Sequence, residues 1–203
     1  MPARQRTHPL VLTLAVVFVC SAALMLLLSS VYPENFSDYR SYLTENRPAL
    51  DFRFDELSEH WTEADVRQRF PSARFECGAV PPEMNLGDWG CRAEISKHNS
   101  VGAMSVSFFF REGRLDCASL NIPWWHHKKA VRSILTFYGR PAGFQRQPSA
   151  GVRLVGWHLE NGSALFFNRD RELNPVAWST LFWSSKRKCG QGNCFVDGTV
   201  GEL

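Results

Sequence analysis

An uncharged apolar run lies near the start of the chain and extends from Leu10 to Val31. As a helix, these 22 residues would reach about 33 Å, which is enough to cross the hydrocarbon core of a bilayer. The alternative, a cleaved signal peptide, has a shorter apolar stretch that ends in small residues at fixed spacing, and residues 28–30 match that cleavage pattern poorly. The pattern therefore predicts an uncleaved transmembrane helix over residues 10–31.

The charges that flank this run predict its orientation. Arg4 and Arg6 precede it, whereas Glu34 and Asp38 follow it, and basic flanks stay on the cytoplasmic side. We therefore expect a single-pass protein of a bacterial inner (cell) membrane, with a cytoplasmic tail over residues 1–9 and a periplasmic or extracellular C-terminal domain. Without Arg4 and Arg6, the 23 basic residues become 21, against 20 acidic ones. This near-neutral balance argues against a nucleic-acid partner.

Two helical patterns follow the transmembrane run. Aromatic residues recur at helical spacing within the juxtamembrane segment, residues 32–51, and predict a short helix that ends before Pro48. A second amphipathic pattern runs over residues 57–70. Within it, Thr62 and Asp65 have the spacing of a capping box, in which each residue bonds the backbone of the other at a helix start. We predict a helix over residues 57–70.

Four strand patterns come next, at residues 73–77, 88–96, 103–110 and 114–122. In the third, apolar residues alternate with Ser105 and Ser107, which is typical of a strand with one buried face. Gly113 offers the positive φ that a tight hairpin needs between the third and fourth strands. Residues 52–122 are thus predicted to form one helix packed on an antiparallel meander.

The same order of patterns then returns over residues 123–185. A helix pattern over residues 124–141 precedes strand patterns at residues 152–160, 163–173 and 175–183. The line SVSFFFREGRL, at residues 105–115, resembles SALFFNRDREL, at residues 163–173. Strand patterning alone could produce this echo by chance, yet the shared order favours duplication. The predicted fold class is α+β, with the N-terminal transmembrane helix followed by a tandem pair of helix-plus-antiparallel-meander units.

Five of the six cysteines follow the apolar run, where an oxidising compartment would let thiols pair. Cys189 and Cys194 enclose a flexible turn in the C-terminal tail, residues 186–203, and we predict a disulfide there. Cys77 and Cys91 lie on two neighbouring strand patterns and form the second predicted disulfide. Cys117 then stays free or pairs between molecules, and a Cys91–Cys117 bridge is the alternative.

The sequence contains none of the motifs that mark a catalytic site. It has no glycine-rich phosphate loop and no Gly-x-Ser-x-Gly nucleophile motif, so we predict no enzymatic activity and no cofactor. His126 and His127 diverge by about 100° on a helix, which prevents easy sharing of one metal ion. We predict no metal site. Lys128 and Lys129 are interpreted as a solvated face, with contact to anionic lipid headgroups as the alternative.

The aromatic residues give the remaining functional signal. Phe108, Phe110 and Phe167 fall on the predicted core face of their strands, whereas Phe109 and Phe166 point to the other face at matched positions of the two units. If that second face is open, Phe109 and Phe166 form a candidate partner face. If it is covered, they belong to the core.

The order of patterns, with HWTEADVRQRFPSARF and SVSFFFREGRL, resembles the helix-then-meander unit of two proteins over residues 50–185. One is the β-lactamase inhibitor protein, a tandem repeat, and the other is the small lipoprotein of the outer-membrane barrel assembly machine. The motifs define no active residue, and this chain has a spanning helix in place of the lipoprotein's lipidated cysteine. The resemblance implies a domain that binds other proteins on its sheet.

We therefore predict a membrane-anchored, extracytoplasmic protein-interaction or assembly-accessory domain, whose partners are the lipid bilayer and an envelope protein. The alternative is a binding module for a small molecule, a lipid or a cell-wall component, held in an aromatic cleft between two sheets. Tryptophan richness suggests this alternative: the residues are Trp89, Trp124, Trp125, Trp157, Trp178 and Trp183.

Overall fold

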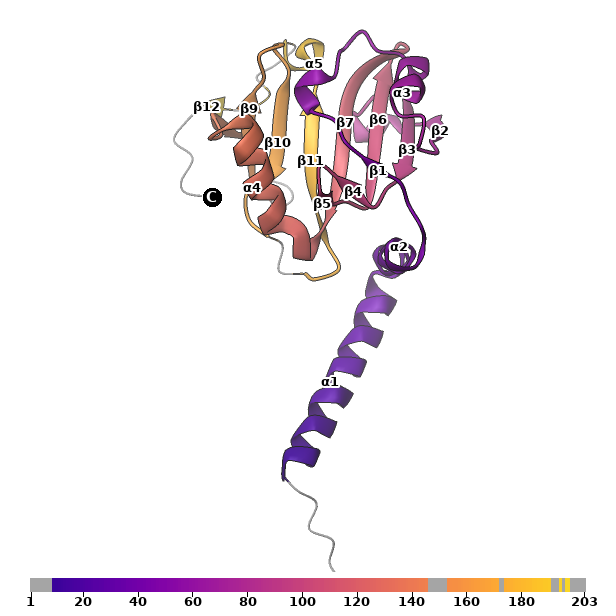
Figure 1. The fold of residues 1–203 in the computed structure, drawn as a ribbon, viewed down its shortest axis with the longest axis vertical. Helices are drawn as coiled ribbons and strands as arrows, with labels where there is room; N and C mark the ends of the chain where they lie inside the picture. Colours follow the sequence, from indigo (N-terminus) through magenta and orange to yellow (C-terminus); the bar gives the residue numbers. More distant parts are fainter. Residues whose placement is uncertain (1–8, 146–152, 172–173, 191–193, 195, 198–203) are drawn as a thin grey trace, which may run out of the picture.

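The computed structural model describes residues 9–145, 153–171, 174–190, 194, 196 and 197. The protein is α+β, with one N-terminal apolar helix and a large antiparallel sheet (Figure 1). The helix, α1 (Pro9–Val31), is long and apolar enough to cross a membrane. This matches the predicted helix over residues 10–31, while the predicted cytoplasmic tail lies outside the described residues except for Pro9.

A second helix, α2 (Pro33–Thr44), begins after the single residue Tyr32. Proline is well suited to the first position of a helix, because its missing N–H has no partner there and its φ is already helical. The predicted juxtamembrane helix is confirmed, and it ends before Pro48 as expected. Residues 32–51 are part of the domain, however, since Tyr39, Arg47 and Leu50 are all buried.

The predicted helix over residues 57–70 is shorter than expected. A 3₁₀ helix, η1 (Phe54–Glu56), comes first, and α3 (Glu63–Arg69) begins only after Thr62. The capping box is confirmed: Thr62 Oγ1 accepts from the Asp65 N–H at 3.4 Å, and Asp65 Oδ2 accepts from the Thr62 N–H at 2.7 Å. Leu57 reaches the core from an irregular segment, which explains why its spacing resembled helical periodicity.

The strands that follow form one nine-stranded sheet in the order β12-β8-β9-β10-β11-β7-β6-β3-β2, and every described pairing in it is antiparallel. The four predicted strands of the first unit are present as β2 (Glu76–Ala79), β3 (Trp89–Glu94), β6 (Ser105–Arg111) and β7 (Arg114–Pro123). The later strands are β8 (Gly143–Gln145), β9 (Leu154–His158), β10 (Ala164–Asn168), β11 (Trp178–Ser184) and β12 (Val196–Asp197).

Helical segments punctuate these strands. The 3₁₀ helix η2 (Pro82–Met84) lies between β2 and β3, and η3 (Trp124–His126) leads directly into α4 (His127–Tyr138). The predicted helix over residues 124–141 therefore consists of a 3₁₀ turn and an α-helix that ends at Gly139, whose φ is 72°. A short helix, α5 (Lys186–Gly190), follows β11.

The two meanders meet at the centre of the sheet. The first runs from β2 to β7 and the second from β8 to β11, and their last strands, β7 and β11, pair with each other. A helix precedes each meander, α3 in the first half and α4 in the second. This topology leaves duplication of one unit a prediction, because strand order alone does not establish a common origin.

The sequence patterns missed a second, small sheet. It consists of β1 (Ala49–Leu50), β4 (Lys97–His98) and β5 (Val101–Gly102), in the order β1-β4-β5. Strands β4 and β5 are an excursion between β3 and β6, so the first half is not the plain meander that was predicted. Two-residue strands are too short to produce a visible alternation of apolar and polar residues.

The predicted hairpin between β6 and β7 is present and uses two residues of positive φ. Gly113 has a φ of 71°, and Glu112 has a φ of 53°. Two central residues with positive φ match the right-handed twist of the flanking strands. The Glu112 N–H donates to Asp88 Oδ2 at 3.0 Å, which helps to hold glutamate in a conformation that it seldom adopts.

The main core lies between one face of the large sheet and the helical layer, which Figure 1 shows in front of the strands. Phe108 lies near its centre and contacts the rings of Phe52, Phe70 and Phe75 at centroid distances of 6.3, 5.6 and 5.8 Å. The predicted core residues Phe108, Phe110 and Phe167 are all buried.

A neutral histidine is part of this core. His98 Nε2 lies 2.9 Å from the backbone carbonyl oxygen of Phe52, and since a carbonyl only accepts, Nε2 carries the ring proton. Burial lowers the pKa of His98 from 6.5 to about 4, although the bond to Phe52 opposes part of this shift. The folded state therefore keeps this ring neutral at pH values where the unfolded chain already binds a proton.

Stability should consequently fall as the pH drops through this window. The unfolded histidine binds a proton below a pH of about 6.5 and the folded one only below about 4, so acid favours unfolding. We expect His98 to account for a loss of about 2 kcal/mol in unfolding free energy between pH 7 and pH 5. Urea titrations at both pH values measure it. His98→Gln should remove this part of the loss, whereas replacing the exposed His60 with Gln should leave the loss intact.

Candidate partner-binding face

The strand register separates the two faces of the large sheet. On the side of the sheet that faces away from the core, residues that pair directly across neighbouring strands form one continuous row from β2 to β8. Paired residues in an antiparallel sheet project to the same side, so this row belongs to one face. In order, its residues are Glu76, Arg92, Ser107, Ser119, Phe182, Phe166, Gly156 and Gly143.

We call the partly exposed part of this side the polar face. Its residues are Arg92, Glu94, Ser107, Phe109, Ser119, Asn121, Thr180 and Phe182. The Asn121 amide donates to Ser105 Oγ at 3.3 Å and accepts from Thr180 Oγ1 at 3.0 Å, which joins three adjacent strands. Small hydroxyl and amide side chains thus occupy the centre of a partly exposed sheet surface, with an aromatic ring on either side.

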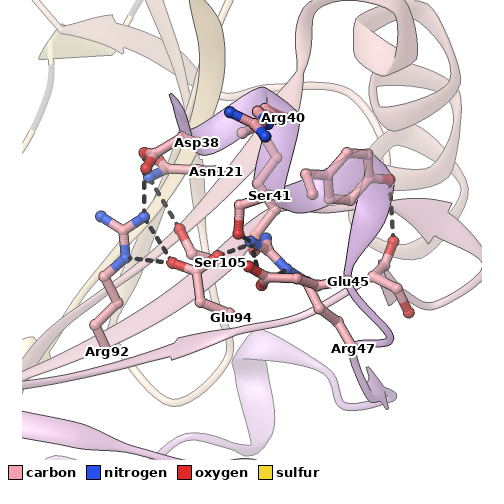
Figure 2. A network of polar contacts seen from close by, with 12 residues as sticks. Asp38, Arg40, Ser41, Glu45, Arg47, Arg92, Glu94, Ser105 and Asn121 are labelled. Atoms are coloured by element: carbon pink, nitrogen blue, oxygen red, sulfur yellow. Dashed lines mark hydrogen bonds and ion pairs between the residues drawn. The ribbon is translucent and has the colours of Figure 1, made fainter. Parts of the chain in front are cut away.

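The edge of the polar face nearest α1 is joined to α2 by a network of charges (Figure 2). The Arg47 guanidinium is buried, forms an ion pair with Glu94 of β3, and donates to the Met104 carbonyl oxygen at 3.1 Å. Arg92, also on β3, forms ion pairs with Glu94 at 2.9 Å and with Asp38 of α2 at 3.3 Å. These contacts fix α2 against β3.

Replacing Arg47 with methionine should therefore loosen α2. The change removes hydrogen bonds of a buried charged group, each worth about 1.5–3 kcal/mol, and we expect a total loss of about 2–3 kcal/mol in unfolding free energy. Faster hydrogen exchange in α2 should accompany it. The control, Arg53→Met, breaks an exposed ion pair with Asp55 and should cost less than about 1 kcal/mol. Equal effects of the two variants would contradict the proposed role of Arg47.

A set of aromatic contacts holds α2 from another side. The Tyr39 hydroxyl donates to the Ala177 carbonyl oxygen at 2.9 Å and accepts from the Trp124 N–H at 3.1 Å. The Tyr39 and Tyr42 rings lie 5.1 and 6.4 Å from the Trp125 ring. Helix α2 is thus packed on the domain rather than acting as a free spacer.

At the opposite end, the first turn of α5 binds a buried carboxylate of β7. Asp116 is 2% exposed, and it forms ion pairs with Arg111 at 3.2 Å, Arg187 at 3.2 Å and Lys188 at 3.9 Å. The Ser185 hydroxyl also donates to its Oδ1 at 3.3 Å. This cluster attaches the segment after β11 to the sheet and closes the far end of the polar face.

The next residue, Cys117, is a free and buried thiol, as one of the two predictions for it stated. Burial raises its pKa to about 11, even though Lys188 Nζ, 2.9 Å from the sulfur, acts in the opposite direction. The thiol is therefore neutral and poorly nucleophilic at physiological pH.

Both predicted disulfides are present. The sulfurs of Cys77 and Cys91 lie 2.11 Å apart, and those of Cys189 and Cys194 lie 2.02 Å apart. Cys77 and Cys91 are directly opposite in the register of β2 and β3, which excludes the alternative pairing of Cys91 with Cys117. These bonds are consistent with an oxidising compartment.

The two residues of the predicted partner face lie on the polar side of the sheet, but in different environments. Phe109 is half-buried beside Gly90 of β3. Phe166 is only 2% exposed, because it packs with Ala164 and Phe182 beneath the Cys189–Cys194 disulfide. Phe166 is therefore a core residue in this structure, which is the covered alternative, and Phe109 alone of the two candidates remains on the partly exposed face. Phe182, whose position on β11 gave no functional signal in the sequence, lies directly opposite Phe166 in the register and is partly exposed.

The adjacent histidines diverge as predicted. His127 is buried, with Nδ1 2.7 Å from Ser179 Oγ and its ring stacked on Phe167, whereas His126 is half-exposed near Gly102. Burial lowers the pKa of both rings. Among the described residues, one group of three potential metal ligands lies within reach of a single ion, and it consists of Glu63, Cys77 and Cys91. Two of its three ligands are sulfurs that already bond each other.

The tryptophans do not converge on one cleft. In the part of the chain that the structure describes, the strands of the two halves form one nine-stranded sheet, so the halves do not enclose the aromatic cleft between two sheets that the alternative prediction placed there. Trp157 and Trp183 are buried and donate to Gly139 and Ser163, whereas Trp89 lies at the surface and donates to Glu63. A cavity of about 400 Å³ does lie at the end of the domain far from α1, but its lining is mainly polar: Asp55, Glu56, Leu57, Ser58, Glu59, His60, Asn161, Ser163, Trp183 and Lys186.

No protein-family model matches this chain, and no curated protein or solved structure shows a significant similarity to it.

Proposed function

We propose that this chain is a single-pass membrane protein whose extracytoplasmic domain binds another envelope protein through the polar face. The observation that carries the proposal is the asymmetry of the large sheet: one side holds the main core, and the other presents a partly exposed polar surface. Serine, threonine and asparagine side chains at its centre suit hydrogen bonds to a partner, and half-buried Phe109 and Phe182 supply apolar contact area.

The membrane topology is part of this proposal. A helix of the length of α1 suits a bilayer span, and the arginines that precede it favour a cytoplasmic N-terminus in a bacterial inner membrane. Two disulfides in the following domain support an extracytoplasmic location. A reporter fused after Leu203 that is active only outside the cytosol tests the orientation, and activity of a cytosolic reporter there would overturn it.

We also propose that the two halves of the domain are copies of one unit. Each half is a helix followed by an antiparallel meander, which β4 and β5 interrupt in the first half, and the final strands of the two meanders pair. This supports the resemblance to the tandem repeat of the β-lactamase inhibitor protein and to the barrel-assembly lipoprotein, and hence a binding role for the sheet. Val66 of α3 and Ala130 and Ile134 of α4 lie in the same core, so both helices cover the same side of the sheet.

The proposed role is binding rather than catalysis. The buried titratable groups that the structure describes in the domain each have partners within the fold: Asp116 has its three cations, His98 bonds Phe52, and His127 bonds Ser179. Groups that are paired in separate places do not supply the converging acid, base or nucleophile that a reaction needs.

Crosslinking of the full-length protein in living cells tests the proposal. We expect one envelope protein to be recovered with the unchanged chain and lost with Ser119→Arg, because a long charged side chain at the centre of the polar face prevents close approach. The control, Thr136→Arg, places the same side chain on the exposed outer side of α4 and should leave recovery unchanged. Equal recovery from both variants would overturn the assignment of the polar face.

A second candidate function is supported by the polar cavity far from α1. Its volume of about 400 Å³ falls within the usual range of small-molecule sites. Of the three carboxylates in its lining, Asp55 and Glu56 form ion pairs with arginine side chains, while Glu59 accepts from a backbone N–H, so the lining favours a small, polar ligand bound by hydrogen bonds. Because Trp183 lines the cavity, titration with amino sugars should change tryptophan emission in the unchanged chain and not in Trp183→Phe. A flat response would remove this candidate.

A further inference from the structure

The link between α1 and the domain is short and leaves little freedom. One residue, Tyr32, separates the last residue of α1 from the first of α2, and consecutive Cα atoms are only about 3.8 Å apart. Helix α2 is in turn fixed to the domain by the contacts of Arg47 and Tyr39 described above. The end of the domain that carries α2 and η3 is therefore held close to the point where α1 leaves the bilayer (Figure 1).

Helix α2 has one side that the fold does not use. Asn35, Tyr39 and Tyr42 point to the domain, where their side chains bond Val176, Ala177 and Ser96. Phe36, Arg40 and Leu43 recur four and three residues apart on the other side, and all three are exposed, Leu43 by 69%. Two large apolar side chains with an arginine between them are thus left at the surface beside the membrane.

Aromatic and basic residues of η3 and α4 extend this surface. Trp125 is 45% exposed even though one side of its ring packs on Tyr39 and Tyr42. Lys128 is exposed in the first turn of α4. Tyrosine and tryptophan favour the headgroup level of a bilayer, and basic side chains near an anionic surface gain about 1 kcal/mol each.

We propose that Tyr32, Phe36, Arg40, Leu43, Trp125 and Lys128 form a membrane-contact surface that rests in the headgroup region of the bilayer that holds α1. The occupant is a lipid surface with anionic headgroups, because this surface is continuous with the membrane-spanning helix and combines apolar with basic side chains. The inference depends on the anchoring part of the proposed function and is independent of any protein partner.

This placement also sets the direction of the polar face. The strands of the large sheet run roughly along the direction of α1 (Figure 1). With the α2 end of the domain on the bilayer, the strands run roughly perpendicular to the membrane plane. The polar face then points sideways, along the membrane surface, rather than towards or away from the bilayer. A partner on that face would then be a neighbour anchored in, or lying on, the same membrane.

The test uses the purified full-length chain in vesicles of phosphatidylglycerol and phosphatidylcholine, in which the phosphatidylcholine carries bromine near the headgroup. Flotation first checks that the chain is bound to the vesicles. Bromine quenches the emission only of tryptophans that lie close to it. We expect Trp125→Phe to lose a quenchable part of the emission. The control, Trp89→Phe, removes an indole that is 40% exposed at the opposite end of β3 and should leave the quenchable emission intact. Unchanged quenching in Trp125→Phe would overturn the proposal.

A second test uses two charge reversals at surface residues. Because these residues are exposed, the changes should alter contact with lipid without loosening the packing of α2 on the domain. Arg40→Glu combined with Lys128→Glu should reduce bromine quenching of the chain in vesicles that contain phosphatidylglycerol. Arg74→Glu combined with Arg140→Glu, an exposed pair near α3 and the end of α4, should not. Equal quenching in both double variants would contradict the anionic membrane-contact surface. Failure to float with vesicles would instead contradict the anchor, and hence the proposed function itself.

Discussion

Replacing Asp116 with alanine should lower the free energy of unfolding by about 3 kcal/mol, which is the scale of breaking a buried ion pair from one side. The carboxylate is 2% exposed and faces Arg111, Arg187 and Lys188. Without it, three positive charges crowd the end of β7, and α5 loses its main attachment. Urea unfolding of the full-length chain in detergent, followed by tryptophan emission, measures the loss.

A matched control distinguishes the buried cluster from an ordinary ion pair. Asp170 pairs with Arg153 at 3.8 Å, and both side chains are mostly exposed. Asp170→Ala should therefore change the unfolding free energy by less than about 1 kcal/mol. If Asp116→Ala and Asp170→Ala have the same free energy of unfolding, the ion pairs of Asp116 do not fix α5 to the sheet.

Truncating Phe108 to alanine should have an equal or larger effect, about 3–5 kcal/mol. Its ring is fully buried between the sheet and the residues that lead into and out of α3, with Phe70 stacked at 5.6 Å. Removing it leaves a cavity where the two layers meet, and neighbouring rings can fill that space only in part. Loss of cooperativity in the urea transition would accompany the drop in stability.

The control for this variant is Phe137→Ala, because Phe137 on α4 is exposed by 43%. Its truncation should cost about 1 kcal/mol, since nearly half of the residue's area already contacts water in the folded protein. A small effect of Phe108→Ala, similar to that of Phe137→Ala, would show that the layer packing is not as described.

The local features of the fold could be predicted from sequence because their causes are local. The alternation of Ser105 and Ser107 with apolar residues shows which side of β6 packs against the core. The spacing of Thr62 and Asp65 marks the start of α3. The pairing of Cys189 with Cys194 follows from a short loop. In each case the interacting residues lie a few positions apart, so their spacing contains the information.

The contacts that attach α2 and α5 at the two ends of the polar face could not be predicted, because they join residues that are far apart in the sequence. Arg47 pairs with Glu94, and Asp116 pairs with Arg187; nothing in the spacing of these residues marks them as partners. The alternation of residues in β10 placed Phe166 on the side of the sheet opposite the core, but it left open whether that side is covered at Phe166. That cover comes from the C-terminal disulfide, which folds back over β10.

These contacts suggest how the parts work together. In the proposed arrangement, α2 and the membrane-contact surface hold the domain near the bilayer, while α5 covers the far end of the sheet. Between these borders the polar face is partly exposed among the described residues, and its polar centre with Phe109 and Phe182 beside it is the surface that we propose for a protein partner. The attachment of α2 depends on the buried charge of Arg47, and that of α5 depends on the buried charge of Asp116. Variants of these two residues should therefore affect the proposed partner binding only indirectly, by displacing α2 or α5 at an end of the polar face.

Site-specific photo-crosslinking in cells tests the central claim most directly. A photoreactive amino acid would be placed singly at Ser107, Ser119 and Thr180 on the polar face, and at Arg132 and Thr136 on the outer side of α4. We predict one shared adduct from the three polar-face positions and none of that mass from the two helix positions. Adducts from α4 alone, or the same adduct from all five positions, would contradict a partner-binding role for the polar face.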